Sequence, residues 1–252
     1  MLNGAWPNLH WSLFDYYMNP IASYFGTKVG TRTEHVAYDY QAQTVYIINH
    51  SLDRQGPRKV SIDLIDMNGK SLTSDEINTK TQPNSSKKLG KVPGISKIQD
   101  VGFLRLTLSD AKTGKQLSRT VHWLAPTVDV LAWDNSTWYH TPVSQYVDFT
   151  SLSSLAPADV KVEVHSRRKG PDVGSRVVLK NKSDVPAFFI KLAAVDVAAD
   201  EEVSPVFWSD NYVSLWPGEE VEVDLRFGKK RCGGVGVEFR GYNVERNMVN
   251  VC

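Results

Sequence analysis

Short runs in which apolar and polar residues alternate recur from residue 44 onward, and they limit the fold of this chain more than any other feature. Residues 60–64 alternate Val, Ile and Leu with Ser and Asp, and residues 160–164 alternate three valines with Lys and Glu. The pattern returns at 221–227 and 235–239. Alternation with a period of two is typical of strands that bury one face. The sequence therefore predicts a mainly β fold.

The expected strands fall into two groups that meet near Pro126. We predict strands at 44–48, 60–66, 101–108 and 118–124 in the first group, and at 160–164, 176–180, 187–195, 221–227 and 235–239 in the second. Asn68 and Gly69 predict a tight turn, and Pro217 and Gly218 predict another. Residues 31–35 are predicted to be a polar connection. The long polar stretch 73–97 is predicted to hold one strand and a flexible loop around 83–88.

A short internal repeat links the two groups. VYIINHS at 45–51 lines up with VVLKNKS at 177–183, and an apolar strand follows each of them. The repeat falls at the same place in both groups, and the short, closely spaced strands fit an immunoglobulin-like architecture. We therefore predict two tandem immunoglobulin-like β-sandwiches, at 34–126 and 127–252.

The first thirty residues follow a different pattern. Residues 1–6 read as a short buried strand, and apolar residues from Leu9 to Tyr17 then recur at helical spacing. Pro7 suits a first helical turn, and the helix is expected to end at Asn19, because a residue before proline avoids the α region. One strand and one helix cannot bury their own apolar faces. This segment is therefore expected to belong to a larger body.

The same segment resembles the end of the catalytic barrel in glycoside hydrolase family 2, most closely the exo-β-D-glucosaminidases. Plant endo-β-mannosidases and β-mannosidases are related to them. The residues that carry the resemblance are Met1-Leu2-Asn3, Ala5-Trp6-Pro7, Trp11, Leu13, Asp15-Tyr16-Tyr17, Pro20 and Tyr24-Phe25-Gly26-Thr27-Lys28, followed by Ser209-Asp210-Asn211-Tyr212 and Trp216-Pro217-Gly218-Glu219. These motifs fall in family order across nearly the whole chain.

The resemblance implies that residues 1–33 are the last strand and helix of a truncated β/α barrel. Enzymes of this family are expected to cleave β-glycosides with retention, by means of two carboxylates about 5 Å apart. The family places both glutamates on earlier barrel strands, so this chain is expected to hold no catalytic residue. Asp15, Glu34 and Asp39 match neither catalytic motif. The sandwiches are expected to brace the barrel, and the rest of that barrel would be their partner.

Asn3 and Trp6 are the candidate substrate-binding residues of an intact parent enzyme. They would stand at the C-terminal end of a barrel strand, where barrel active sites are built. By resemblance, Trp6 would form the floor of a sugar-binding subsite and Asn3 would donate or accept a hydrogen bond nearby; the alternative for Trp6 is packing at the barrel rim. The substrate would be a β-linked amino sugar or a mannoside, and the sequence leaves that choice open.

Aromatic residues of the second half suggest a further possible binding surface. Trp133, Trp138, Tyr139, Trp208 and Trp216 would make a sugar-binding platform if they shared one exposed face. Aromatic residues of a β-sandwich more often fill its core or an interface. The segment from Trp208 to Tyr212 has a second interpretation as well, that of a structural turn.

Composition excludes several classes of function. The net charge of +1 provides no general field for nucleic acid or an anionic membrane, and no apolar run reaches the length of a membrane span. The six histidines are scattered, which predicts no metal site, and the glycines at 233, 234 and 236 precede a strand, so no cofactor is indicated. The N-terminus does not resemble a signal peptide. Because the parent enzymes are expected to be extracellular, the chain is expected to begin part-way through a longer one.

Secretion would also bear on possible modifications. Asn49, Asn84, Asn135 and Asn181 each begin an Asn-X-Ser/Thr sequon for N-glycosylation. Cys232 and Cys252 are either two free thiols or a disulfide that ties down the last strand, which would contribute about 3 kcal/mol. A rival to the whole interpretation is a free-standing carbohydrate-binding or adhesion module without catalysis.

Overall fold

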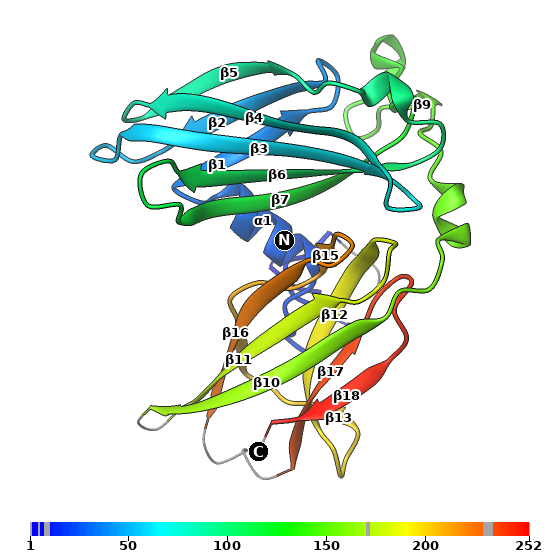
Figure 1. Cartoon of the computed structure of the whole chain (residues 1–252). Coiled ribbons are helices and arrows are strands. Elements are labelled where there is room, and N and C mark those ends of the chain that lie inside the picture. The colour runs from blue at the N-terminus through cyan, green and yellow to red at the C-terminus, as the bar shows by residue number, and fades with distance from the viewer. Residues whose placement is uncertain (1, 5, 8–10, 170–171, 229–233, 252) are drawn as a thin grey trace. The chain divides into compact units, whose positions relative to one another are not determined.

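The computed structural model describes residues 2–4, 6–7, 11–169, 172–228 and 234–251. The chain forms two compact units, one from residues 29–155 and the other from residues 1–28 together with 156–252. Each unit contains one sandwich of antiparallel sheets, so the predicted mainly β fold with two sandwiches in tandem is confirmed (Figure 1). The predicted limits at 34–126 and 127–252 stay predictions, because the two units also include connecting segments.

The first sandwich, in residues 29–155, has one sheet of three strands and one of four. The three-stranded sheet has the order β1 (Glu34–Asp39), β2 (Thr44–Asn49), β5 (Ser85–Lys91). The other has the order β4 (Ser71–Thr81), β3 (Gly56–Asp66), β6 (Gly102–Asp110), β7 (Gln116–Leu124), with a 3-10 turn η1 (Ile95–Lys97) before β6. The alternation in 60–64 faces the interior as predicted, since Val60, Ile62 and Leu64 pair with Leu108, Leu106 and Leu104 and all six are at most 1% exposed.

The polar stretch 73–97 holds more strand than the sequence predicts. The expected flexible loop at 83–88 is wrong, because most of it lies in β5, and β1 replaces part of the expected connection at 31–35. β4 and β5 each lie at the edge of a sheet. Edge strands commonly carry lysine, which discourages pairing with other chains. The polar composition of 73–97 therefore reflects its place in the sheets and not a loop.

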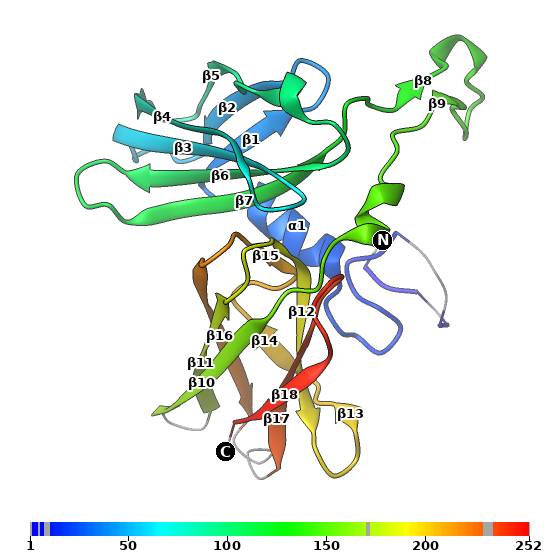
Figure 2. The same cartoon turned by 45° about the vertical axis from the view of Figure 1, so that its right-hand side comes forward.

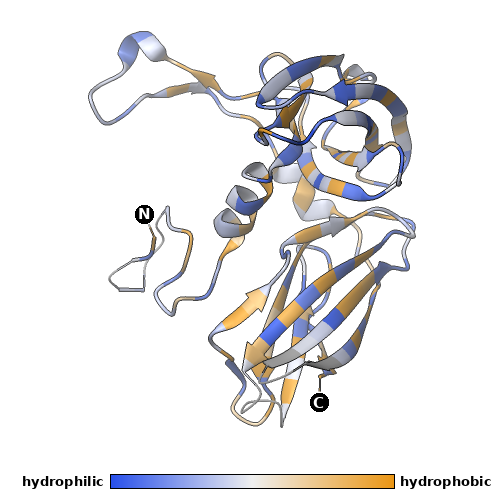
Figure 3. Ribbon diagram, turned by 90° about the vertical axis from the view of Figure 1, so that its left-hand side faces the viewer, coloured by the Kyte–Doolittle hydropathy of each residue, from blue (hydrophilic) through white to orange (hydrophobic). Residues whose placement is uncertain are grey.

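The second sandwich, in residues 156–252, also pairs two sheets. One has the order β10 (Val160–Lys169), β11 (Asp172–Asn181), β16 (Glu220–Gly228), β14 (Val206–Trp208). The other has the order β13 (Glu201–Glu202), β12 (Ala187–Asp196), β17 (Val235–Arg240), β18 (Asn247–Asn250), and β15 (Val213–Leu215) also pairs with β12. Figure 3 shows the alternation of hydrophilic and hydrophobic residues along these strands. β12 is paired on both sides and mostly buried, as its uniformly apolar sequence predicts.

The two sandwiches differ in the pairing of one edge strand. In the first, β4 pairs with β3, whereas in the second β14 pairs with β16. Both arrangements occur among immunoglobulin-like domains. The internal repeat nevertheless falls at equivalent places, at the ends of β2 and β11, which are the second strands of their sandwiches. Its asparagines, Asn49 and Asn181, are both buried.

The opening residues do not form the predicted strand and helix. The described residues among 1–7 lie in no strand, and those from 11 to 20 lie in no helix. The α-helix, α1, comes later, at Ala22–Gly30. Its sequence has two glycines and few strong helix formers, so propensity gives little warning of it. Contacts with the second sandwich account for it instead, as described below.

Along the sequence, a hairpin follows the last strand of the first sandwich, β7, and precedes the first strand of the second, β10. β8 (Val130–Leu131) pairs with β9 (Val143–Gln145), and two 3-10 turns, η2 (Trp133–Asn135) and η3 (Thr150–Ser154), complete this part of the chain. We call residues 129–147 the aromatic hairpin. Figure 2 shows its two strands separate from the sheets of the first sandwich.

Candidate functional site

The opening segment, residues 2–20, folds back on itself through backbone hydrogen bonds. The carbonyl oxygen of Leu2 accepts bonds from the N–H groups of Leu13 at 3.2 Å and Phe14 at 2.9 Å. Phe14 forms a β-bridge with Pro20, and the N–H of Ile21 donates to the carbonyl of Leu13 at 3.2 Å. These bonds hold the start of the segment beside the residues that lead into α1.

Asn3 and Trp6, the predicted substrate-binding residues, lie in this segment. The Nδ2 atom of Asn3 lies 3.3 Å from the sulfur of Met18, and the side chain of Asn3 is half-buried. Trp6 is 65% exposed. The side-chain hydrogen bonds of the described residues join Asn3 to Met18 and not to Trp6. The structure therefore presents an open indole face and an amide, but no closed sugar subsite among the residues it describes.

Trp6 belongs to a group of exposed apolar side chains in the opening segment. The members that are more than two-fifths exposed are Leu2, Trp6, Trp11, Tyr16, Tyr17 and Met18, and Trp11 reaches 88%. A monomeric soluble protein rarely gathers so many large apolar side chains on its surface, and such a surface usually marks an interaction site.

Helix α1 anchors the opening segment to the second sandwich. Phe25 is 2% exposed and lies in the same hydrophobic core as strands β10 to β18, with its ring centroid 6.0 Å from that of Tyr212. Lys28 donates from Nζ to the carbonyl oxygen of Trp208 at 2.9 Å. Its ammonium also lies 5.9 Å from the ring centroids of Tyr24 and Phe25, within the range of a cation–π attraction.

The segment 209–212 is a structural turn, which agrees with one of the two interpretations of its sequence. Asn211 is buried; its Oδ1 accepts from the N–H of Leu192 at 2.7 Å and its Nδ2 donates to the carbonyl of Leu192 at 2.8 Å. Ser209 forms a matching pair of bonds with the backbone of Asp224, each 2.8 Å long. The segment is therefore bonded to both sheets of the second sandwich. Its last residue, Tyr212, packs against Phe25 of α1.

The five aromatic residues of the suggested platform do not share one exposed face. Trp208 and Trp216 are each 7% exposed and belong to the second sandwich. Trp133, Trp138 and Tyr139 belong to the aromatic hairpin and are 69%, 94% and 74% exposed. A single platform on the second sandwich is therefore wrong, because two of its members are buried within that sandwich.

Short-range bonds hold the aromatic hairpin in shape. The N–H of Ala132 donates to the carbonyl of Pro142 at 2.9 Å, and the N–H of Thr137 donates to the carbonyl of His140 at 2.8 Å. The rings of Trp138 and Tyr139 meet edge to face at 4.8 Å. The hairpin thus displays its aromatic rings on an ordered turn.

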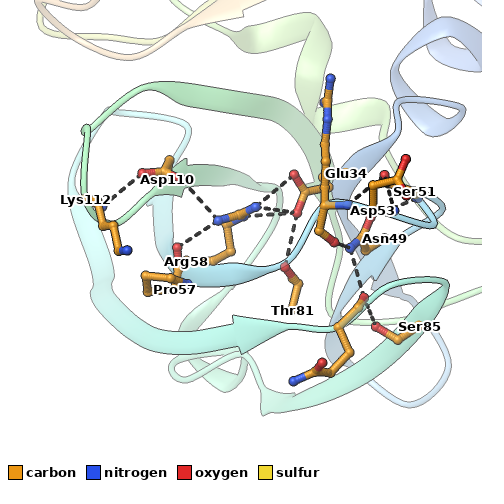
Figure 4. Close-up of polar contacts among 12 residues, drawn as sticks. Glu34, Asn49, Ser51, Asp53, Pro57, Arg58, Thr81, Ser85, Asp110 and Lys112 are labelled. Carbon is orange, nitrogen blue, oxygen red and sulfur yellow. Dashed lines mark hydrogen bonds and ion pairs between the residues drawn. The ribbon is translucent and has the colours of Figure 1, made fainter.

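Three carboxylates were named in the sequence as matching neither catalytic motif of the family, and each has a structural partner. Asp15 accepts from the N–H of Asn19 at 2.8 Å, and Asp39 accepts from the N–H of Ala42 at 2.9 Å. Both are turn contacts. Glu34 is buried beside Arg58, whose Nε and Nη2 atoms donate to its two carboxylate oxygens at 3.0 and 3.1 Å (Figure 4).

Arg58 is the centre of a buried polar network that the sequence analysis missed. Its Nη1 donates to the carbonyl of Pro57 and to Asp110 Oδ2, and Thr81 donates to Glu34 Oε1 at 3.2 Å. A backbone hydrogen bond from Thr113 is the main cause that lowers the pKa of Asp110. Arg58 is buried on the same face of β3 as Val60 and Ile62. A charged residue at a core-facing position of an apolar alternation is the sequence signal that could have revealed this network. A bidentate pair of this kind engages both carboxylate oxygens of Glu34 in a structural contact.

A second cluster in the first sandwich surrounds His122. Its Nδ1 lies 3.1 Å from the hydroxyl of Tyr40, and its ring centroid lies 5.6 Å from that of Tyr38. Burial lowers the pKa of His122 to about 4 and is the main cause that raises the pKa of Tyr38 to about 12. His122 is therefore neutral at neutral pH, and this cluster acts as packing.

The remaining predicted site residues fall into three classes. Asn49 and Asn181 are buried, and Asn84 and Asn135 are exposed. Cys232 and Cys252 lie outside the described residues. Across the described ranges, no group of three or more His, Cys, Asp or Glu side chains is placed to hold a metal ion, and none of their helices is long and apolar enough to cross a membrane.

Comparison with protein families matches both sandwiches. Residues 138–244 match the family described as the exo-beta-D-glucosaminidase Ig-fold domain, and residues 42–129 match the mannosidase Ig/CBM-like domain. The exo-beta-D-glucosaminidase of Arthroderma benhamiae is 54% identical over 99% of this chain, and that of Amycolatopsis orientalis is 34% identical over 90%. The chain spans only 28% and 22% of the length of these two relatives.

Solved structures agree with the sequence comparison. The crystal structure of the Amycolatopsis orientalis exo-chitosanase CsxA matches all of this chain with a TM-score of 0.91 and 30% identity, and the match covers 30% of that protein. A β-D-mannosidase from Dictyoglomus thermophilum, at 18% identity and a TM-score of 0.65, shares the fold. The resemblance noted in the sequence is thus confirmed, and a free-standing module is not favoured. The chain is thus similar over nearly its whole length to exo-β-D-glucosaminidases and corresponds to a C-terminal part of those enzymes, with two immunoglobulin-like domains in tandem.

Proposed function

We propose that this chain serves a secreted exo-β-D-glucosaminidase by completing its catalytic barrel with the opening segment and by bracing that barrel with the two sandwiches. The parent enzyme would remove β-linked amino sugars from the end of a chitosan-like chain. Relatives that align with 99% and 100% of this chain carry the name of that activity and are more than three times as long. The retaining chemistry requires a pair of carboxylates, which the remainder of the parent would supply.

The observation that carries the proposal is the contrast within the opening segment. Phe25 is buried in the second sandwich, whereas Trp6, Trp11 and Tyr17 are 65%, 88% and 68% exposed. One end of the segment is thus fixed to a domain of this chain, and the other end presents exposed apolar rings. A catalytic barrel that packs on Trp11 and Tyr17 would remove these two rings from water, at about 25 cal/mol per Å² of apolar surface, and would leave Trp6 for the substrate.

Trp6 and Asn3 would serve the substrate once the barrel is complete. An exposed indole offers a flat apolar face, which suits the C–H surface of a pyranose ring. The amide of Asn3 would bind a sugar hydroxyl in place of the Met18 sulfur, a weak acceptor. Amino sugar is favoured over mannoside because the second sandwich matches the glucosaminidase domain family.

A chimeric enzyme tests the proposal. The matching part of the Arthroderma benhamiae relative would be replaced by this chain, with which it shares 54% identity. We expect the chimera to release glucosamine from chitosan oligosaccharides. In the chimera, Trp6→Ala should lower kcat/KM at least tenfold, whereas Phe207→Ala, a ring 63% exposed on β14, should change it less than twofold.

One result would overturn the proposal as a whole, and another would overturn only the role given to Trp6. One is a folded chimera, with the circular dichroism spectrum of the natural relative, that cleaves no glucosaminide. The other is a Trp6→Ala chimera with unchanged kcat/KM, which would remove Trp6 from the substrate site while leaving the bracing role intact.

A further inference from the structure

The four sequons of this chain differ in the accessibility of the atom that would carry the glycan. N-glycosylation joins a sugar to the side-chain amide nitrogen, Nδ2, of asparagine. Asn49 and Asn181 are 1% and 0% exposed, whereas Asn84 and Asn135 are exposed. The fold therefore separates the sequons into two pairs.

The amide of Asn49 is fully used by its surroundings. Nδ2 donates to the carbonyl of Arg54 at 2.7 Å and to that of Gln82 at 2.9 Å, and Oδ1 accepts from the N–H of Ser51 at 2.9 Å. One side chain thus ties the end of β2 to the loop that follows it and to the chain just before β5 (Figure 4).

Asn181 makes the same set of contacts in the second sandwich. Nδ2 donates to the carbonyls of Val185 at 2.8 Å and Trp216 at 3.1 Å, with Leu215 at 3.3 Å, and Oδ1 accepts from the N–H of Ser183 at 3.0 Å. It ties the end of β11 to the following loop and to the chain before β16. The Asn-X-Ser repeat in the sequence is therefore explained by one structural device used twice.

This device is incompatible with a glycan. Transfer forms a bond between Nδ2 and the anomeric carbon of a lipid-linked oligosaccharide; the bond from that carbon to the lipid diphosphate breaks, the lipid diphosphate leaves, and one Nδ2 proton passes to solvent. The nitrogen then keeps a single hydrogen. Two carbonyls at Asn49 and three at Asn181 depend on the two hydrogens of Nδ2. At least one carbonyl would lose its donor, and a sugar would need space in a buried site.

Among the described residues, the side chains of the other two asparagines, Asn84 and Asn135, are not held by hydrogen bonds of this kind. Asn84 stands in the turn before β5, where its backbone N–H donates to the carbonyl of Ser51 at 2.8 Å. Asn135 ends the 3-10 turn of the aromatic hairpin, where its N–H donates to the carbonyl of Ala132 at 3.0 Å. Within the part of the chain that the structure describes, neither side-chain amide takes part in a hydrogen bond.

We infer that this chain, when it folds in a secretory pathway, carries N-linked glycans on Asn84 and Asn135 and none on Asn49 and Asn181. The exposed pair consists of modification sites. The buried pair consists of structural positions whose Asn-X-Ser form follows from the turn they build. The inference needs no assumption about the catalytic role of the parent enzyme.

Secretion of the full chain from a yeast host tests the inference. A peptide amidase would release the glycans from the folded protein in ¹⁸O-water. This reaction converts each glycosylated asparagine to ¹⁸O-labelled aspartate, which mass spectrometry locates in the sequence. We expect label at Asn84 and Asn135 and unlabelled asparagine at Asn49 and Asn181. Label at either buried position, or its absence at either exposed one, would overturn the inference.

Variants of the third sequon residue provide a matched control that leaves every asparagine in place. Ser86→Ala and Thr137→Ala should each remove one of the two steps in electrophoretic mobility that deglycosylation produces, and the double variant should show no shift. Ser51→Ala and Ser183→Ala should keep both steps. A shift that persists in the secreted double variant would place a glycan on a buried asparagine and contradict the inference.

Discussion

Asn49 and Asn181 show how a single side chain can organise two distant parts of a chain. Each has no more than 1% of its surface exposed and bonds to three or more backbone groups. The sequence displayed the repeat but not its role, because hydrogen-bond partners such as Trp216 lie 35 residues away along the chain. The same is true of Arg58. Its core-facing position can be inferred from the alternation in the sequence, whereas its carboxylate partner Glu34 is evident only from the fold.

Removal of the Asn181 amide should destabilise the second sandwich strongly. Asn181→Ala leaves buried carbonyls without donors and a buried N–H without an acceptor, and we expect a loss of about 3 kcal/mol in the free energy of unfolding. Asn135→Ala, at an exposed position, should cost less than about 0.5 kcal/mol. Urea unfolding followed by tryptophan fluorescence measures both. Similar losses in the two variants would contradict the proposed role of the buried amide.

His122 should make the first sandwich sensitive to mild acid. Its pKa is about 4 in the folded protein and about 6.5 in an unfolded chain. Below pH 6.5 the unfolded state therefore binds more protons, so stability is complete above that pH and falls as the pH drops toward 4. We expect a contribution of about 3 kcal/mol over this range.

The control for this effect is His122→Gln, which cannot titrate. Chemical unfolding at a series of pH values between 4 and 7 should show a steeper loss of stability in the natural chain than in the variant. Identical pH profiles would mean that the folded pKa of His122 is not depressed.

Among the structural elements, strands with an alternating or apolar sequence were predictable, whereas the two polar strands of the stretch 73–97 were predicted only in part. β3, β12, β16 and β17 face the core with alternate or continuous apolar residues. β4 and β5 have one open edge and a polar sequence, so their periodicity is weak. The helix α1 was missed for a related reason, since tertiary contacts stabilise it more than its own propensity does.

Phe25 should decide whether α1 and the opening segment stay attached to the second sandwich. Phe25→Ala removes a ring that is 2% exposed, and we expect a cost of about 3 kcal/mol. Amide exchange should then accelerate across residues 22–30, while the matched variant Phe207→Ala should leave it unchanged. In the natural chain, residues 11–20 should exchange faster than β16, because local stability follows buried contacts. Equal protection of both regions would contradict this view.

The two cysteines bear on the last strand. β17 and β18, which lie on either side of Gly241, run antiparallel. We expect Cys232 and Cys252 to form a disulfide in secreted material, which requires Cα atoms within about 7 Å of each other. Intact mass after alkylation, with and without reduction, measures it. Two alkylated cysteines in unreduced secreted protein would disprove the pairing.

At the scale of the whole molecule, the chain should have no glycosidase activity of its own. Asp15, Glu34 and Asp39 have structural partners, and the retaining mechanism needs two free carboxylates about 5 Å apart. Incubation of the isolated chain with an aryl β-D-glucosaminide should release no more phenol than buffer, while the chimera described above is the positive control. Turnover that disappears when one carboxylate of this chain is changed would contradict the expectation.

The turn at 209–212 also limits how the length of this chain can vary. Ser209 is bonded to β16 in one sheet and Asn211 to β12 in the other, so the chain changes sheets within two residues. One added residue would move either side chain out of reach of its partner. Insertions and deletions among related sequences should therefore be absent from 209–212 and should gather at the tip of the aromatic hairpin, whose loop between β8 and β9 holds no such double attachment. Related chains would then differ in what the aromatic hairpin displays, while the distance between the two sheets of the second sandwich stays constant.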